Sequence, residues 1–319
     1  MTRFGADIGG DIGGEIGPKI GPRIGIVGAG RVGAVLAAAL RAAGHEVVAV
    51  SGESDASRHR ADELLAGVPV LKPSAVARAS DVLFLTVPDD MIANVSSMLA
   101  ASGAIRPGQF VVHTSGRHGL AVLTDATGVG ARAMAVHPAM TFTGSAVDFA
   151  RLIGCAFGVT TGPDERVAAE SLVAELGGHA MWIAEEHRTL YHAGLAHGAN
   201  HLVTLVAEAM EMLATAGVED PAVTLRPLLA AALENALTLG DFALTGPIVR
   251  GDANTVRDHL ADLAANAPHT LPSYAALARA TLSRVVTDGR VLPIRAAKIA
   301  RILDEAESAS APTRPAFLR

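Results

Sequence analysis

The stretch from Arg23 to Ser51 reads RIGIVGAGRVGAVLAAALRAAGHEVVAVS, and its pattern decides the fold. A short apolar run leads into three glycines, Gly28, Gly30 and Gly33, and an alanine-rich run and a second β-branched run follow them. This order predicts a strand, a tight turn, a helix and another strand. In that context a G-x-G-x-x-G motif indicates a dinucleotide site, whereas an isolated glycine triplet would be weak evidence.

Each glycine of the motif has a separate expected role. Gly28 permits the sharp turn, Gly30 allows the backbone to approach a pyrophosphate, and Gly33 allows the helix to pack against the strand. The pyrophosphate would bind to free N–H groups at the helix N-terminus. The residues predicted to contact the cofactor in this stretch are Gly28, Ala29, Gly30, Arg31, Val32 and Gly33.

The composition of the 319-residue chain narrows the class of protein. Hydrophobic residues make up 50% and aromatic residues 3%, which suits parallel strands and closely packed helices. The net charge of −6 gives no reason to expect nucleic-acid binding, and the single Cys155 excludes an internal disulfide. The sequence contains neither an uninterrupted apolar run of membrane-spanning length nor an apolar signal core. We therefore expect a cytoplasmic protein without a membrane segment.

The chain divides into four predicted segments. Residues 1–22 carry a tetrapeptide repeat (DIGG, DIGG, EIGP, KIGP) that is too rich in glycine and proline for a helix or a core, so we expect a flexible tail. Strand and helix patterns alternate over residues 23–184, which predicts an α/β, doubly wound Rossmann domain. Only helix patterns follow over residues 185–310, the predicted substrate and dimerisation domain, and residues 311–319 form a tail.

Polar loops follow several of the predicted strands. The strands are expected at residues 24–27, 47–50, 68–71, 81–87, 109–113, 131–136, 155–160 and 180–183. In a doubly wound sheet, ligands bind beyond the carboxyl ends of the strands, so these loops should lie along one edge. Val87 and Pro88 are predicted to contact the cofactor there, and His137 to contact the substrate.

The residues after the second strand bear on the choice between NAD and NADP. An acidic residue about twenty positions after the glycines would bind the ribose hydroxyls of NAD. Here the strand ends at Ser51, and Glu53 comes two positions later. Ser51, Ser54 and Arg58 would instead hold a 2′-phosphate, because a guanidinium matches phosphate geometry. We therefore predict NADP, with NAD as the alternative.

Three further places carry polar residues that suit substrate chemistry. Ser115, which follows a strand, would either hydrogen-bond a substrate carbonyl or serve as a turn residue. On the long helix, His192 and Asn200 are two four-residue steps apart and share a face. In a loop between later helices, Arg250 would bind a carboxylate in bidentate fashion or form a structural turn with Asp252.

Several of these blocks together resemble a family of Rossmann-like proteins that carry a C-terminal helical domain of unknown function. The blocks are Val87-Pro88-Asp89 with Ile92, His113 to Gly116, His137-Pro138 with Phe142, Tyr191-His192 with Asn200, and Gly246 to Asp252. The clan includes pyrroline-5-carboxylate reductase and 3-hydroxyisobutyrate dehydrogenase, and part of the family resembles alternative ketopantoate reductases. Hydroxyacid dehydrogenases of the clan have a catalytic lysine four residues before the asparagine, whereas this chain has Ala196 there.

The resemblance implies an NADPH-dependent reductase of a small 2-oxo acid, with 2-dehydropantoate as the favoured substrate and pantothenate synthesis as the setting. His192 is the expected proton donor, and Asn200 and Ser115 would polarise the carbonyl. The expected substrate contacts are His137, Arg250 and Asp252. The alternatives are reduction of a cyclic imine and a non-catalytic, dinucleotide-binding interaction or sensor protein. No metal is expected, and the helical domain is expected to form a homodimer.

Overall fold

The computed structural model describes residues 21–310, so most of the predicted N-terminal repeat and the tail over residues 311–319 lie outside the described residues. The chain forms two compact units, Met1–His197 and Gly198–Arg319. Each is described by itself below, starting with the unit that contains the glycine motif.

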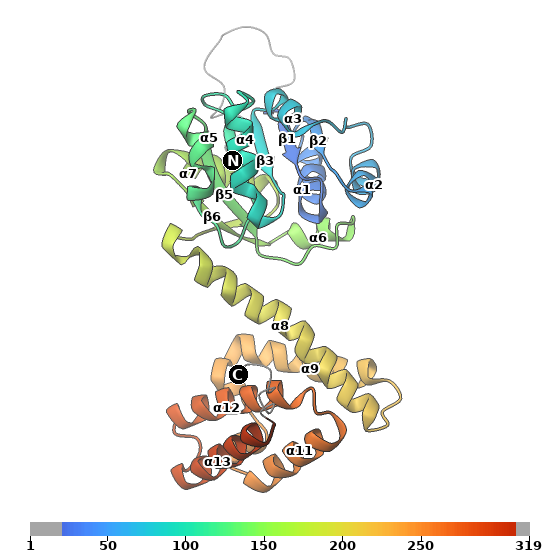
Figure 1. Ribbon diagram of the computed structural model, residues 1–319, viewed down its shortest axis with the longest axis vertical. Helices are drawn as coiled ribbons and strands as arrows, with labels where there is room; N and C mark the ends of the chain where they lie inside the picture. Colours follow the sequence, from blue (N-terminus) through green and yellow to red (C-terminus); the bar gives the residue numbers. More distant parts are fainter. Residues whose placement is uncertain (1–20, 311–319) are drawn as a thin grey trace, which may run out of the picture. The chain divides into compact units, whose positions relative to one another are not determined.

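A seven-stranded sheet in the order β2-β1-β3-β4-β5-β6-β7 forms the centre of the first unit (Figure 1). The strands are β1 (Ile24–Val27), β2 (Val47–Ser51), β3 (Val82–Leu85), β4 (Phe110–His113), β5 (Arg132–Pro138), β6 (Ala156–Thr161) and β7 (His179–Trp182). All neighbouring strands run parallel except β5 and β6, which are antiparallel. The predicted α/β, doubly wound fold is therefore confirmed, and the antiparallel pair is a feature that the sequence did not indicate.

Helices pack on both faces of this sheet. They are α1 (Arg31–Ala42), α2 (Asp55–Leu64), α3 (Pro73–Ala79), α4 (Ile92–Ala101), α5 (Thr124–Gly128), α6 (Val147–Leu152) and α7 (Arg166–Glu175). Short 3-10 helices link several of them: η2 (Asp89–Met91), η3 (Leu120–Leu123), η4 (Pro163–Glu165) and η5 (Glu185–His187). The strand predicted at residues 68–71 is reduced to one bridge, Val50 to Val70, because the segment is exposed and pairs with β2 at a single point.

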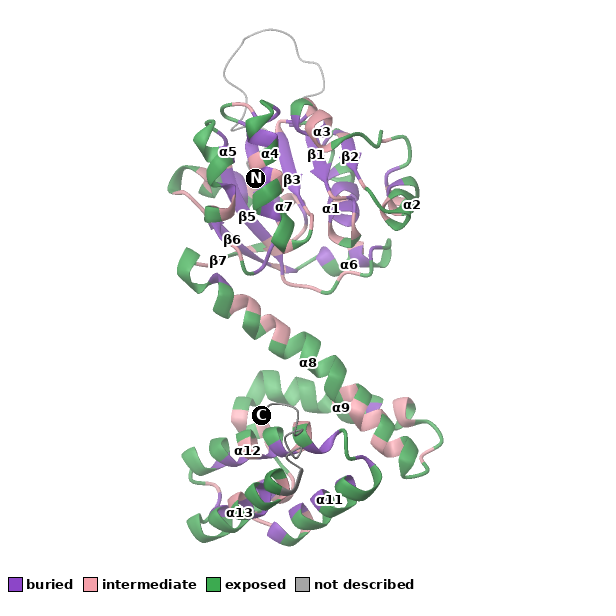
Figure 2. Cartoon of the chain, viewed as in Figure 1, coloured by how far each residue is buried: buried purple, intermediate pink, exposed green. Residues whose placement is uncertain are grey.

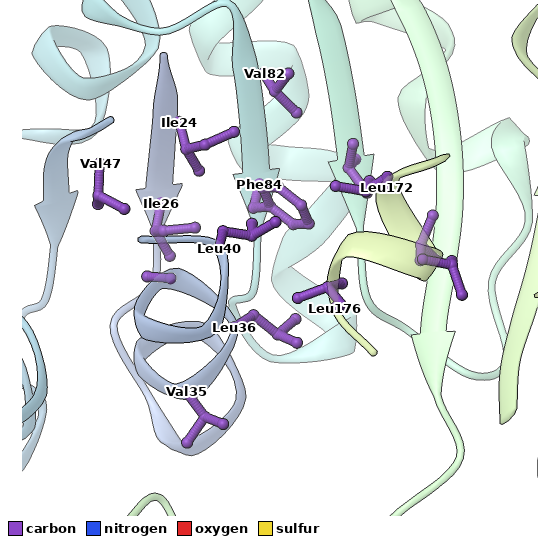
Figure 3. Packing of buried hydrophobic residues seen from close by; sticks show 14 of the residues in the cluster. Ile24, Ile26, Val35, Leu36, Leu40, Val47, Val82, Phe84, Leu172 and Leu176 are labelled. Atoms are coloured by element: carbon purple, nitrogen blue, oxygen red, sulfur yellow. The ribbon is translucent and has the colours of Figure 1, made fainter. Parts of the chain in front are cut away.

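Side chains alternate between the two faces along each strand, which creates two apolar cores. Ile24 and Ile26 of β1 belong to one core together with Phe84 of β3, under helices α1 and α7 (Figure 3). Val27 belongs to the other core, which α3 and α4 cover. Because both faces are buried, the strands are nearly continuous apolar runs, as parallel strands usually are.

The second unit is helical. It contains most of α8 (Arg188–Thr215), then α9 (Pro221–Leu239), η6 (Gly240–Ala243), α10 (Pro247–Arg250), α11 (Ala253–Asn266), α12 (Leu271–Thr287) and α13 (Pro293–Ser310). Its core lies among α11, α12 and α13, with Val256, Val285 and Leu303 fully buried. The boundary between the units falls inside α8, after His197, and not at residues 184–185 as the sequence suggested. The reason is that Arg188 and Tyr191, in the first turn of α8, hydrogen-bond to the loop after β4 and to β5.

Helix α9 exposes much of its apolar surface within its own unit. Figure 2 shows α9 mostly as exposed, and Leu228, Leu233 and Leu237 are 53–77% exposed. By length and composition alone the segment Pro221–Arg250 is apolar enough to cross a membrane, and it is the one such segment among the described residues. This is weak evidence for a membrane segment, since helices of soluble proteins pass the same test.

Candidate functional site

The glycine turn lies at the carboxyl end of β1, where a close approach to β3 requires it. Gly28 has a φ of +106°, and a Cβ atom there would come within 2.9 Å of the Thr86 and Val87 backbone. A Cβ on Gly33 would collide with the carbonyl oxygen of Gly28 and the hydroxyl of Thr86. The Thr86 hydroxyl donates a hydrogen bond of 2.7 Å to that same carbonyl. Two of the three glycines are thus explained by packing within the fold.

Gly30 differs from its two neighbours because the space beside it is open. A Cβ on Gly30 would find no heavy atom nearer than 4.0 Å. Gly30 is also the N-cap of α1, and in the described part of the chain this helix has no side-chain cap on its first N–H groups. Open space beside uncapped N–H groups at a helix N-terminus is what a pyrophosphate requires. The residues present therefore fit a dinucleotide at this turn.

The residues predicted to hold a 2′-phosphate lie at the end of β2 and in α2. Ser51 is buried, and its hydroxyl accepts a hydrogen bond of 3.2 Å from the N–H of Gly28. Ser54 caps α2 by accepting from the N–H of Ser57. The guanidinium of Arg58 contacts the carboxylate of Asp55 and the carbonyl oxygen of Glu53, and is about half exposed. Ser51 therefore supports the glycine turn, while Ser54 and Arg58 lie at the surface.

His113, the last residue of β4, is completely buried and fixed at both ring nitrogens. Its Nδ1 accepts a hydrogen bond from the N–H of Ser115, so Nε2 carries the proton and donates to the carbonyl oxygen of Gly119 at 2.8 Å. Burial lowers the pKa of His113 to about 4. His113 is therefore an uncharged residue that shapes the loop after β4.

That loop presents Ser115 to an acidic side chain. The hydroxyl of Ser115 donates a hydrogen bond of 2.8 Å to Asp89, at the start of η2, and accepts one from the N–H of His118. Ser115 is only 3% exposed. Ser115, the residue predicted to polarise the substrate carbonyl, is thus a buried turn residue whose hydroxyl donates its hydrogen bond to Asp89. It would hydrogen-bond a substrate carbonyl only after leaving Asp89.

Two histidines converge at Gly116, next to Ser115, and a tyrosine contacts one of them. A Cβ on Gly116 would lie 3.0 Å from Nε2 of His137 and would collide with the ring of His192. The two imidazoles pack edge to face with ring centres 6.0 Å apart. Nδ1 of His137 lies 2.9 Å from the hydroxyl of Tyr191. The structure therefore brings together His137 from β5 and His192 from α8, as the sequence required for a common site.

The surroundings of His137 and Tyr191 shift the pKa values of both side chains. Burial lowers the pKa of His137 to about 4, and the nearby charges of Arg188 and His192 lower it further than Asp89 raises it. Burial also raises the pKa of the Tyr191 hydroxyl. At neutral pH His137 is therefore uncharged, and Tyr191 keeps its proton.

The sequence reasoning missed two charged residues, Glu185 of η5 and Arg188 of α8. Both hydrogen-bond to the segment that follows β4. The carboxylate of Glu185 accepts hydrogen bonds from the N–H groups of Leu120 and Ala121. The guanidinium of Arg188, one turn later, donates to the carbonyl oxygen of Ser115 at 2.5 Å. Charged residues at the start of a helix are common, so the sequence offered no signal that Arg188 is buried or that both residues hydrogen-bond to this segment.

The other predicted substrate residues belong to the second unit. Asn200 and Arg250 are exposed there. Asp252 is the N-cap of α11, where its carboxylate accepts hydrogen bonds from the N–H and hydroxyl of Thr255, and these bonds lower its pKa. Asp252 therefore serves as a helix cap, and the role of Arg250 stays a prediction. Within residues 21–310, no cluster of three or more His, Cys, Asp or Glu could hold a metal ion.

The fold and this edge of the sheet define a Rossmann-like protein with a helical C-terminal unit. Two family models match the chain: a Rossmann-like domain over residues 12–138, and a domain of unknown function, DUF2520, over residues 155–281. The chain thus combines a Rossmann-like domain with a DUF2520 domain, which confirms the pairing expected from the sequence. No curated protein sequence matches the chain.

Solved structures show the same fold at low sequence identity. A Bacteroides fragilis protein named as an NADP oxidoreductase is 22% identical, with a TM-score of 0.70 over 82% of this chain and 97% of its own. Pyrroline carboxylate reductase of Plasmodium falciparum, with NADP bound, is 12% identical, with a TM-score of 0.54 over 91% and 98%. A reductive aminase of Aspergillus terreus, in complex with NADPH and ethyl levulinate, is 16% identical, with a TM-score of 0.59 over 88% and 99%.

Proposed function

We propose that the protein is an NADPH-dependent reductase of a small 2-oxo acid, with 2-dehydropantoate as the favoured substrate. The observation that carries this proposal is the convergence of His137 and His192 on Gly116, at the edge of the sheet that also carries the glycine turn. The names of the structural relatives support NADP and the class of reaction. The sequence resemblance to alternative ketopantoate reductases supports the substrate.

The cofactor would lie along the carboxyl ends of the strands, as in other doubly wound sheets. The open side of Gly30 and the N-terminus of α1 would receive its pyrophosphate. Ser54 and Arg58 are the proposed partners of the 2′-phosphate, since both lie at the surface after β2. When bound, the nicotinamide supplies a hydride to the carbonyl carbon.

The protein must supply a proton to the carbonyl oxygen, and His192 is the proposed donor. His137 is uncharged at neutral pH, because its pKa is about 4, so it is a poor source of that proton. His192 packs against His137 and Gly116 and is, like His137, only partly buried. Roles for Asn200 and Arg250 in binding the substrate remain predictions from the sequence.

Reduction of a cyclic imine is the second candidate. An imine substrate binds in its protonated form and needs no proton donor, which suits an edge lined by an uncharged His137. The fully buried guanidinium of Arg188 nevertheless lies close enough to His137 to affect its protonation. Its positive charge would also repel a cationic substrate bound there. A 2-oxo acid carries a negative charge, so we rank it first.

Oxidation of NADPH by the purified full-length protein tests the proposal. We expect turnover with 2-dehydropantoate or a related 2-oxo acid, weaker turnover with a cyclic imine, and tighter binding of NADPH than of NADH. Turnover of the imine alone would favour the second candidate. Binding of NADPH without turnover of any carbonyl or imine in the panel would reject the reductase.

A further inference from the structure

Among the described residues, Arg188 is the largest fully buried side chain, and it is a cation. It is the first residue of α8. The helix dipole favours negative charge at this end, so it does not stabilise the positive charge of Arg188. Within the described part of the chain, no Asp or Glu forms an ion pair with it. A buried charge without an ion-pair partner in direct contact is costly, and an apolar side chain would fill the same space without that cost.

The hydrogen bonds of Arg188 connect three separate elements. One terminal nitrogen donates to the carbonyl oxygen of Gly158 at 3.3 Å and to the hydroxyl of Thr160 at 3.1 Å, both on β6. The other donates to the carbonyl oxygen of Ser115, in the loop after β4. All three acceptors are neutral, and Nε has no partner among residues 21–310. The guanidinium thus joins α8, β6 and the loop that carries Gly116.

Each of these contacts lies next to a residue of the candidate site. Gly158 is the residue of β6 that pairs with His137 of β5 in the antiparallel register. The ring of Tyr191 packs against Gly158, so closely that a Cβ there would collide with it. The centre of the Arg188 guanidinium lies 5.9 Å from the centre of the same ring. Arg188 therefore lies next to the candidate site. It hydrogen-bonds to the backbone of two neighbouring segments, at Ser115 beside Gly116 and at Gly158 opposite His137.

We propose that Arg188 is a positioning residue: its guanidinium fixes the Ser115-Gly116 loop against β6, and its charge adds to burial in disfavouring protonation of the His137 imidazole. The groups that face His137 are Arg188, Tyr191 and His192 from α8, His113 from β4 and Asp89 from η2. Asp89 is the one negative charge among them. Loss of the Arg188 charge would leave Asp89 less opposed and would favour protonation of His137.

The charge and the hydrogen bonds of Arg188 can be separated by two substitutions. Arg188→Gln removes the charge but keeps one amide donor, and Arg188→Lys keeps the charge but loses the planar fork. Arg117→Gln is the matched control, because Arg117 is exposed in the same loop and forms its ion pair, at 3.7 Å, with Asp89. All three are made in the full-length protein.

The first measurement is an NMR titration of the histidine side chains, with the His137 signal assigned from a His137→Asn variant. Arg188→Gln should raise the pKa of His137 by about 1, since a nearby like charge has an effect of about that size. Arg188→Lys and Arg117→Gln should leave it near the wild-type value. An unchanged His137 pKa in Arg188→Gln would overturn the electrostatic part of the proposal.

The second measurement is hydrogen exchange of the backbone amides over residues 116–121. Both Arg188 variants should exchange about tenfold faster there, because local opening becomes easier when a buried contact is lost. Arg117→Gln should match the wild type, and equal protection in all four proteins would overturn the positioning role. Should Arg188→Gln not fold, Thr160→Val takes its place, since it removes one acceptor of Arg188 and keeps the charge. Faster exchange with an unchanged His137 pKa is then expected.

The catalytic consequence of this inference rests on the proposed function, but these two measurements do not. If the protein is a reductase, Arg188→Lys should lower kcat by about tenfold or more, because small displacements at a reacting site are costly. The affinity for NADPH should be unchanged, since, among the described residues, the hydrogen bonds of Arg188 go to Gly158, Thr160 and Ser115 and not to the glycine turn. Absence of turnover in the wild type would reject the reductase and leave the Arg188 measurements valid.

Discussion

The hydroxyl of Tyr191 and the Nδ1 atom of His137 lie 2.9 Å apart, so a residue of α8 orients the imidazole at the end of β5. Because His137 is uncharged at neutral pH, only one of its nitrogens carries a proton. The bond to Tyr191 therefore decides what Nε2 presents to Gly116. If Tyr191 donates, Nε2 carries the proton on the side of the proposed substrate.

Tyr191→Phe removes this bond and keeps the aromatic ring against Gly158. We expect kcat of the reductase to fall by about tenfold, since the imidazole loses its fixed orientation, while the affinity for NADPH stays the same. Steady-state kinetics and a nucleotide titration measure the two effects. Tyr274→Phe is the matched control, because Tyr274 forms the same kind of bond, at 2.8 Å, with His259 in the second unit. Equal kinetics for both variants would leave Tyr191 without a catalytic role.

His192→Ala distinguishes the two candidate reactions. A ketone requires a proton donor, and loss of such a donor costs about 100-fold or more in rate. We therefore expect turnover of a 2-oxo acid to fall by about that factor, while turnover of a cyclic imine barely changes. His187→Ala, at an exposed position on η5, is the control. Retention of full activity toward the 2-oxo acid by His192→Ala would exclude His192 as the donor.

The glycine motif offers a pair of substitutions with opposite expected effects. Gly30→Ala adds a methyl group to open space, so it should leave the melting temperature unchanged but weaken NADPH binding by about tenfold or more. Gly33→Ala places its methyl group against the Gly28 carbonyl and the Thr86 hydroxyl, and should lower the free energy of unfolding by about 1–3 kcal/mol. Thermal unfolding and a nucleotide titration measure both. Normal nucleotide binding by Gly30→Ala would refute the proposed pyrophosphate site.

The fold was largely predictable because its signals are local. The glycine triplet, the continuous apolar strands and the later helix patterns each occupy a few neighbouring residues, and the structure confirms the sheet and the helices they indicate. The antiparallel β6 was not predictable, since a buried strand has the same apolar pattern in either direction. Its direction matters for the site, because it places Gly158 opposite His137.

The candidate site was predictable only in part, because its contacts join residues far apart in the sequence. Strand ends and helix spacing selected His137 and His192, and the structure places both at Gly116. Whether a side chain is buried depends on packing that local patterns do not contain. For that reason Arg188 was missed, and Ser115, which is bonded to Asp89, could not be told from a free hydroxyl.

The stability of the protein should fall in mild acid because of His113. Its pKa is about 4 in the folded state, compared with 6.5 for an ordinary histidine, so the unfolded chain binds more protons between these two values. The free energy of unfolding should decrease as the pH falls through this range, by about 3 kcal/mol for this residue. Urea unfolding at several pH values measures the decrease. His113→Gln should make the pH dependence shallower, whereas His59→Gln, at an exposed position, should not.

The homodimer expected from the sequence stays a prediction, and α9 is where we expect the second copy to bind. Its exposed leucines, among them Leu233 and Leu237, would lose contact with water in a dimer, and burial of such side chains drives association. We expect light scattering to give twice the mass of one chain, and Leu237→Glu to shift the protein toward the monomer. Ile294→Glu, at a similarly exposed position on α13, should remain dimeric. A monomeric wild type at micromolar concentration would contradict the prediction.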